Sequence, residues 1–375
     1  MTLLRVFLFK GGHPLYETLV NHPPVGVEYL PRRPTQEMQE YALYQPGHSV
    51  VRKVVDGAFS LVNLPRYYPV LRKYDLVHSG RGFFILGPNK YVVDVEHVAS
   101  FAGMRHARLT SPGLRKAIAR SLAKDKCFGL LPHCHAARKT ISLVTADRRV
   151  DSKTTVIYPS VEPVKTSPRK AETVPEILFM GEYFWKGGRE VLAACERLAS
   201  RLDFHLTYIS LRVHPPESLI KKIREKVSVD YIQGPIPRSR LFEEIYPKTD
   251  VFAMPTYIDT FGYAFLEAMS HGIPCIGARH FAVPEIISHD VTGIIVEPPL
   301  SYFDEKGVGH PELAVESYDN ARTVEELASA IERLVSSASL RERMGASALR
   351  EVTDGRFSIA KRNALLRSVY EGVSA

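Results

Sequence analysis

Residues 250–278 are the stretch that most constrains the fold of this 375-residue chain. The apolar run DVFAMPT comes first, the helix-like FGYAFLEAMSH follows a short loop, and the apolar IPCIGA comes after Gly272. A buried strand, a helix and a second buried strand predict one βαβ unit of a parallel sheet. Asp259 or Thr260, just before the helix, is a suitable N-cap. In such sheets ligands bind beyond the carboxyl ends of the strands, where Asp259 lies.

Two carboxylates, Asp259 and Glu267, stand eight positions apart in this unit. Glu267 lies about two turns into the helix, roughly 10 Å from its start. That length approximates the separation of the two ends of a nucleotide-diphosphate-sugar. Free backbone N–H groups of Phe261, Gly262 and Tyr263 could hold the diphosphate between them. The alternative is that Asp259 is only an N-cap and Glu267 only part of a solvated helix face.

The rest of the chain shows the same alternation of strands and helices in two successive series. In the first half we expect strands at 4–9, 74–79, 90–97, 127–134 and 154–160, and a helix at 111–124. In the second half we expect strands at 177–181, 203–210 and 230–234, helices near 188–200 and 216–226, and two final helices at 323–338 and 357–371. Two such series predict two doubly wound, Rossmann-like domains that face a cleft.

The domain boundaries follow from composition. Residues 161–176 are rich in Pro and charge and form the best linker candidate, while residues 301–320 look like an inserted loop. We therefore predict a first domain at 1–170, a second at 171–355, and a C-terminal helix at 356–375 that packs back on the first domain.

Charge is unevenly distributed along the chain. Residues 1–170 hold 26 Lys and Arg against 12 Asp and Glu, whereas residues 171–375 hold 23 against 29. A basic first half predicts contact with an anionic partner. Within it, GLRKAIARSLAKDK (113–126) has apolar residues on one face and cations elsewhere, as in a helix lying on an anionic bilayer. The alternative is an ordinary amphipathic helix whose apolar stripe packs on the sheet.

Cysteine usage and hydropathy predict a cytoplasmic protein, and the cytoplasmic face of the membrane is one location that fits this prediction. The four cysteines have no CxxC spacing, which suits a reducing compartment. No run of about 18 apolar residues occurs, and the first residues resemble a strand more than a signal peptide. A zinc site at His133–His135 is conceivable from the residue types, but no fourth ligand is evident.

Three motifs together resemble retaining glycosyltransferases of family 4, with the GT-B fold. They are DTFGYAFLEAMSHGIPCIGARHFAVPEIISHDVTGIIVEP (259–298), ILFMGEYFWKGG (177–188) and VIYPSVE (156–162). The resemblance covers most of the second half closely and the first half loosely. It implies an α/β GT-B architecture and transfer of a sugar from a nucleotide-diphosphate-sugar, a UDP- or GDP-sugar, to an acceptor hydroxyl. It implies no metal and no cofactor besides this co-substrate.

The resemblance also implies roles for individual residues. Asp259 would contact donor-sugar hydroxyls, Glu267 the ribose, and Lys186 the diphosphate. His97, in the first domain, would contact the donor sugar or the departing phosphate; the alternative is a structural histidine. The remaining implied donor-binding residues are Gly11, Gly12, Arg189, Gly234, Ile236, Phe261, Gly262 and Tyr263. For Lys186 the alternative is a solvated loop lysine, and for Gly11 and Gly12 a plain tight turn.

Three features depart from the family pattern. Asp259 replaces a glutamate, Glu182 stands where many members have an arginine beside the diphosphate, and the loop at 210–215 lacks the usual glycines. Two other functions therefore stay open: a sugar-nucleotide-binding protein that has lost transfer, and a GT-B phosphorylase or epimerase. The expected partners are a nucleotide-sugar donor, an anionic or lipid-linked acceptor and an anionic membrane surface, but no nucleic acid.

Overall fold

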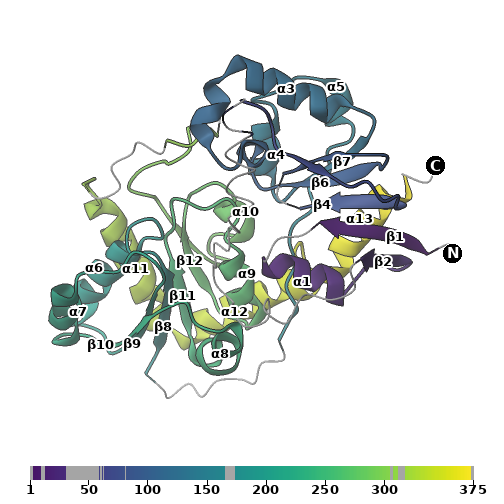
Figure 1. Ribbon diagram of the computed structural model, residues 1–375. Coiled ribbons are helices and arrows are strands. Elements are labelled where there is room, and N and C mark those ends of the chain that lie inside the picture. Colours follow the sequence, from purple (N-terminus) through teal and green to yellow (C-terminus); the bar gives the residue numbers. More distant parts are fainter. Residues whose placement is uncertain are drawn as a thin grey trace.

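The computed structural model describes residues 3–9, 13–30, 59, 61, 63–80, 82–164, 174–304, 307–310 and 317–372. These residues form two separate parallel sheets, each with helices packed against it (Figure 1). The prediction of an α/β protein with two Rossmann-like domains is therefore confirmed.

The first sheet has the strand order β2-β1-β4-β6-β7. Its strands are β1 (Leu4–Phe9), β2 (Val27–Leu30), β4 (Leu76–Ser79), β6 (Tyr91–Val95) and β7 (Cys127–Pro132), and a separate parallel pair joins β3 (Tyr67–Pro69) to β5 (Phe84–Leu86). Every residue of β6 is buried, as expected for a strand of a parallel sheet covered on both faces. The helices of this part are α1 (Pro14–Asn21), α3 (Pro112–Ala123), α4 (His135–Ile141), α5 (Arg148–Asp151) and the short η2 (Val98–Ala102) and η3 (His106–Thr110).

The second sheet has the strand order β10-β9-β8-β11-β12-β13. Its strands are β8 (Glu176–Gly181), β9 (His205–Ser210), β10 (Ser228–Gln233), β11 (Val251–Met254), β12 (Cys275–Ala278) and β13 (Gly293–Val296). Its helices are α6 (Gly188–Leu198), α7 (Glu217–Arg224), α8 (Arg238–Arg240), η4 (Leu241–Ile245), η5 (Tyr246–Lys248), α9 (Tyr263–Ser270), α10 (Val283–Ile286), α11 (Ala321–Val335) and α12 (Ala338–Thr353). The βαβ unit predicted at 250–278 is thus β11, α9 and β12.

One predicted strand is wrong, and several elements were not predicted. Residues 154–160 form no strand; Thr155 and Ile157 donate backbone hydrogen bonds to Leu130 and Pro132, so the segment runs beside β7 without extending the sheet. Three helices end the described chain instead of two, because α12 was not predicted. The short strands β2, β3, β5 and β13 were not predicted either.

Helix α3 shows which interpretation of its apolar stripe is right. Leu114, Ile118 and Leu122 are each 0% exposed and belong to the core of the first domain. The interpretation that this stripe lies in a bilayer is therefore wrong, since the ordinary packing of an amphipathic helix accounts for it. The cations of the same helix remain exposed to solvent.

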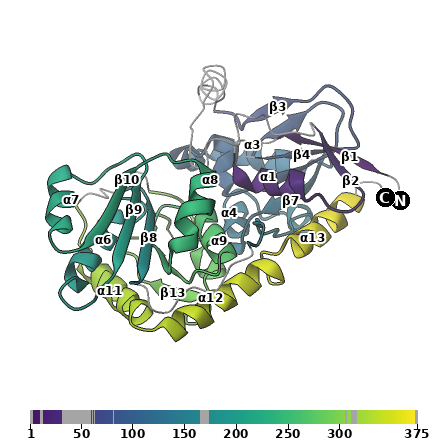
Figure 2. The same cartoon turned by 90° about the horizontal axis from the view of Figure 1, so that it is seen from below.

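The C-terminal helix α13 (Ile359–Glu371) crosses from the second domain to the first (Figure 2). Tyr370 of this helix hydrogen-bonds to Tyr29 at 3.0 Å and to Nδ1 of His78 at 2.6 Å. Arg362 donates to the carbonyl oxygens of Thr18 and His22. These contacts hold α13 against α1 and the first sheet.

A carboxylate from the second domain also caps a helix of the first. Glu285 accepts hydrogen bonds from the backbone N–H groups of His135 and Ala136, each at 2.8 Å, and from the Tyr158 hydroxyl. Negative charge at a helix N-terminus is favourable, so this contact stabilises the arrangement of the two domains.

Candidate functional site

The candidate site lies at the carboxyl ends of three strands of the second sheet. Lys186 follows β8, Asp259 follows β11 and His280 follows β12. The three strands are neighbours and run parallel, so their carboxyl ends share one edge. Ligands of open α/β sheets bind at this edge.

Lys186 and Asp259 form an ion pair at this edge. Nζ of Lys186 lies 2.6 Å from Oδ2 of Asp259 and donates a second hydrogen bond to the carbonyl oxygen of Ile258 at 3.1 Å. Both side chains keep about a fifth of their surface exposed, 24% and 19%. Burial alone would raise the pKa of the Asp259 carboxyl, but the Lys186 ammonium outweighs it and holds that pKa below its usual range.

Helix α9 begins later than predicted, so Glu267 lies about one turn into it and not two, and neither predicted N-cap caps it. Its N-cap is Gly262, whose φ of +90° lies in the left-handed region that favours glycine. Oδ1 of Asp259 instead accepts a hydrogen bond from the N–H of Phe261 at 3.3 Å. The Tyr263 hydroxyl donates to the carbonyl oxygen of Ser160, which ties the start of α9 to the first domain.

Glu267 does not lie on a solvated helix face, because it is only 4% exposed. Its Oε1 accepts a hydrogen bond from Nε of Arg238 at 3.0 Å, and its Oε2 accepts one from the Tyr246 hydroxyl at 3.3 Å. Arg238 also lies 3.5 Å from Glu17 of α1, so it links the two domains. Burial raises the pKa of Glu267 above its usual range even though Arg238 opposes that shift. Sequence reasoning missed Arg238, although its position shortly after β10 is a signal that could have indicated it.

The charge of Glu182, the acid that departs from the family pattern, is balanced within the structure. Arg212 forms a salt bridge to Oε1 of Glu182, which is itself 3% exposed. Arg212 belongs to the loop after β9 that lacks the usual glycines. The two departures from the family pattern thus meet in one ion pair.

Other predicted donor-binding residues fall in several places. Arg189 stacks on the ring of Tyr318 at 4.4 Å and donates to Glu190 at 3.2 Å. Gly234 follows β10 and Ile236 is buried beside it. Gly11 and Gly12 lie outside the residues that the structure describes.

His97 caps the short helix η2 in the first domain. Its Nδ1 accepts a hydrogen bond from the N–H of Ala99 at 2.9 Å, so the proton of the neutral ring is on Nε2, which donates to the carbonyl oxygen of Gly307. Burial, with His106 nearby, lowers the pKa of His97 to about 3. The imidazole is therefore neutral at pH 7. Both ring nitrogens are engaged within the chain.

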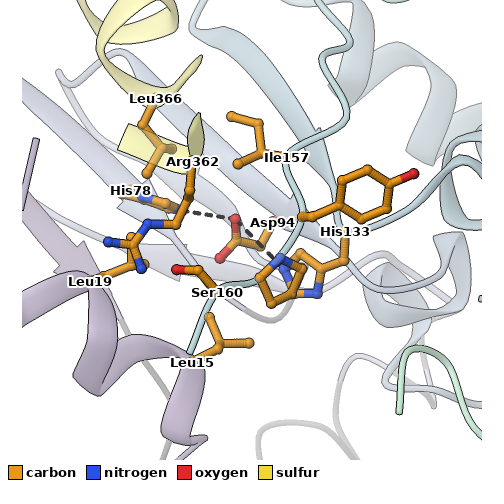
Figure 3. Close-up of a pocket in the computed structure, with 11 residues that line it drawn as sticks. Leu15, Leu19, His78, Asp94, His133, Ile157, Ser160, Arg362 and Leu366 are labelled. Carbon is orange, nitrogen blue, oxygen red and sulfur yellow. Dashed lines mark hydrogen bonds and ion pairs between the residues drawn. The ribbon is translucent and has the colours of Figure 1, made fainter. Parts of the chain in front are cut away.

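His133 and His135, the histidines of the HCH sequence, lie at the end of β7 and the start of α4. No group of three His, Cys, Asp or Glu side chains in them is placed to hold a metal ion. His133 faces Asp94, which also lies 2.9 Å from Nε2 of His78, beside a cavity of about 20 Å³ (Figure 3). A cavity of that size has room for about one water molecule, so it is no site for a sugar nucleotide.

Comparison with known proteins places a recognisable domain over the candidate site. The family model described as "Glycosyl transferases group 1" matches residues 174–304. N-acetyl-alpha-D-glucosaminyl L-malate synthase of Bacillus anthracis is 39% identical over 54 residues, 14% of each chain. D-inositol 3-phosphate glycosyltransferase of Mycolicibacterium smegmatis is 23% identical over 256 residues, 62% of this chain and 57% of that protein. These alignments cover only part of both relatives.

Solved structures extend the likeness to the whole fold. Anabaena HepE in complex with UDP has a TM-score of 0.59 at 14% identity and covers 99% of this chain and 100% of that one. A glycosyltransferase of Rickettsia africae has a TM-score of 0.57 at 13% identity, covering 99% and 98%. Residues 174–304 therefore carry the sequence of a glycosyl transferases group 1 domain, within a chain whose fold is GT-B.

Proposed function

We propose that this protein is a retaining glycosyltransferase of family 4 that transfers a sugar from a nucleotide-diphosphate-sugar to an acceptor hydroxyl. The observation that carries the proposal is the Lys186–Asp259 ion pair beside the N-terminus of α9, with the buried Glu267 about one turn into that helix. A cation, backbone N–H groups and two carboxylates are thus the groups that would bind one donor molecule at the start of α9.

The donor would lie across the start of α9. The Lys186 ammonium and the helix N-terminus would hold the diphosphate, since both favour negative charge. Asp259 would accept hydrogen bonds from sugar hydroxyls, and Glu267, held by Arg238, would accept them from the ribose. Because Arg212 balances Glu182, that acid does not leave an uncompensated charge beside the phosphates. The balance favours a working enzyme over a protein that has lost transfer.

Retention would follow from reaction on one face of the sugar. The bond from the anomeric carbon to the diphosphate oxygen breaks, the acceptor oxygen bonds to the same face, and its proton passes to the departing phosphate. The chain orients both substrates and stabilises charge on the leaving group through Lys186. His97 and the backbone at Gly11 and Gly12 would serve the same leaving group from the first domain. No metal is required in this scheme, because protein cations take that role.

The acceptor would be anionic and bound by the basic first domain. The exposed cations of α3, at Arg115, Lys116, Arg120 and Lys124, remain available for it. A lipid-linked phosphate at an anionic membrane surface fits this charge, and an acidic polysaccharide would satisfy it equally. Among the described residues, no helix has the length and apolar character needed to cross a bilayer. The membrane contact proposed here is electrostatic, because it rests on these cations.

A thermal-shift screen followed by a transfer assay tests the proposal. A bound donor raises the Tm because it stabilises only the folded state. We expect one class among UDP-, GDP- and ADP-sugars to raise it, and the same class to give up its sugar to an acceptor. Binding without transfer or donor hydrolysis would favour the sugar-nucleotide-binding alternative. Sugar release that requires inorganic phosphate would favour a phosphorylase.

A further inference from the structure

A hairpin from the second domain reaches into the first domain beside the candidate site. It comprises residues 301–304 and 307–310, which we call the Phe303 hairpin. Asp304 and His310 donate backbone hydrogen bonds to Val308 and Tyr302, and Phe303 pairs with Gly309 in an antiparallel bridge. The hairpin follows β13, within the region predicted to be an inserted loop. The Phe303 hairpin is part of this chain and not a bound substrate.

The ring of Phe303 lies between one histidine from each domain. It stacks on His97 of the first domain at 5.3 Å and 18°, and on His280 of the second domain at 5.3 Å and 19°. Nε2 of His280 lies 3.3 Å from the backbone nitrogen of Asp259 and 3.2 Å from its carbonyl oxygen. Phe303 is thus one ring away from Asp259 and in contact with His97, the two side chains proposed to hold the donor sugar.

Phe303 has no face left for a sugar to stack on. It is 7% exposed, and the rings of His106, Phe281 and Tyr302 surround it in addition to the two stacked histidines. An aromatic residue that lines a sugar pocket would offer one ring face to the substrate. Phe303 instead fills the space between the two domains.

The backbone of the hairpin occupies the polar groups of the first domain as well. The carbonyl oxygen of Gly307 accepts the hydrogen bond from Nε2 of His97, and the N–H of Gly309 donates to Nδ1 of His106 at 3.3 Å. The ring nitrogen of His97 that could bind a sugar hydroxyl is therefore used by the chain itself.

From these contacts we infer that the Phe303 hairpin is an internal plug of the donor-sugar site, which must withdraw before the sugar can bind between His97 and Asp259. This inference rests on the proposed function. The hairpin does not take part in the nucleotide portion of the proposed site, because the hydrogen bonds of Glu267 to Arg238 and Tyr246 do not involve it. The plug thus opposes binding of the sugar and not of the nucleotide.

A reversible crosslink provides the direct test. A Cβ built on Gly307 lies 4.0 Å from Cβ of Thr140 in α4, within the range of a disulfide. In the double variant Thr140→Cys and Gly307→Cys, oxidation should lock the hairpin in place. We expect UDP and GDP to bind the oxidised and reduced forms alike. In the oxidised form, UDP-glucose or GDP-mannose should bind no more tightly than UDP or GDP. Reduction should make the nucleotide-sugar bind more tightly than the free nucleotide and should restore transfer. The controls are the oxidised parent and the oxidised single variants Thr140→Cys and Gly307→Cys; the last of these measures the effect of a side chain at Gly307, whose φ is +81°.

Two single variants test the plug without a crosslink. Phe303→Ala removes the stacked ring. Gly309→Ala keeps the ring but places a methyl group 2.7 Å from Cε1 of Tyr302 in the hairpin and 3.0 Å from Cγ of His106 in the first domain, which disfavours docking. Because a competing docked state lowers apparent affinity, both should tighten nucleotide-sugar binding, by about fivefold or more, and leave nucleotide binding unchanged.

The opposite results separate the two proposals. If both single variants weaken nucleotide-sugar binding, or if the oxidised double variant binds and transfers like the reduced one, Phe303 is a wall of the site and the plug is refuted. If no nucleotide or nucleotide-sugar binds the parent or any variant, the proposed function is refuted, and the plug is refuted with it.

Discussion

Nζ of Lys186 lies 2.6 Å from Oδ2 of Asp259. The ammonium proposed to bind the diphosphate is therefore ion-paired with the carboxylate proposed to bind the donor sugar. The two groups come from different βα loops of the second sheet, after β8 and β11. Because their opposite charges are compensated by one another, the pair can remain at a half-buried edge at low cost. Binding of a diphosphate would draw the ammonium toward the phosphate and free the carboxylate for sugar hydroxyls.

Replacing Lys186 tests the role of its charge. Lys186→Ala should lower kcat/KM for transfer by about 10²-fold or more, the scale for loss of one preorganised group that stabilises developing charge. Steady-state kinetics with the donor identified by the screen give the ratio. Lys186→Arg, which keeps the charge, should retain more activity. An alanine variant within a few-fold of the parent would show that another cation, such as Arg189, holds the diphosphate.

Asp259 and Glu267 should affect different kinetic constants. Glu267→Gln should raise the Kd for the free nucleotide and the donor KM with little change in kcat, because a ribose contact is shared by ground and transition states. Asp259→Asn should mainly lower kcat. Isothermal titration and steady-state rates check both. If the two variants behave like the parent, the donor does not lie along α9.

The glutamine variant is needed because Glu267 forms a buried ion pair. Glu267→Ala would deprive Arg238 of its nearest carboxylate, and breaking a buried pair from one side typically costs about 3–5 kcal/mol of stability. We expect Glu267→Ala to lower the Tm clearly and Glu267→Gln to lower it less. This difference separates a loss of fold from a loss of ribose binding.

Most strands of the two large sheets, but not β2 and β13, could be predicted because local patterns determine them. Apolar runs such as LRVFLF at β1 and DVFAM at β11 indicate strands that are buried on both faces. The failures lie where tertiary contacts decide. Residues 154–160 have a strand-like composition but only run beside β7, and the position of Gly262 delays the start of α9 past both predicted N-caps.

The candidate site was predictable where one loop carries the residues, and not where distant segments meet. Asp259 and Glu267 share one βαβ unit, so their order in it could be predicted, although α9 begins at Tyr263 and the helical spacing expected between them does not hold. Arg212 balances Glu182 from 30 positions away, and Phe303 reaches His97 across the domain boundary. Such pairings depend on how loops pack within and between the domains, which periodicity and composition do not encode.

Membrane binding, if it occurs, should be purely electrostatic, because the apolar stripe of α3 is buried. Co-sedimentation with liposomes should increase with anionic lipid and disappear at high salt, since each cation near the surface contributes about 1 kcal/mol. Changing Arg115, Lys116, Arg120 and Lys124 to Gln should strongly reduce it.

A matched control alters the second domain by the same charge. Changing Lys221, Lys222, Arg224 and Lys226 to Gln should leave liposome binding close to that of the parent. A parent that ignores anionic liposomes at low salt would rule out the membrane surface and favour a soluble anionic acceptor.

Stability should fall in mild acid because of histidines around Phe303. Burial lowers the pKa of His106 and of His280 to about 4, and that of His97 to about 3. An unfolded histidine titrates near 6.5, so below that pH the unfolded chain binds protons that the folded chain does not. Each of the three should therefore lower the free energy of unfolding by about 2 kcal/mol between pH 7 and pH 5.

Urea unfolding of the parent and of His106→Gln at both pH values measures the contribution of one ring. The variant should lose less stability on acidification than the parent, by about 2 kcal/mol. Equal losses in the two proteins would mean that His106 is protonated in the folded state, and that the rings around Phe303 are not held neutral.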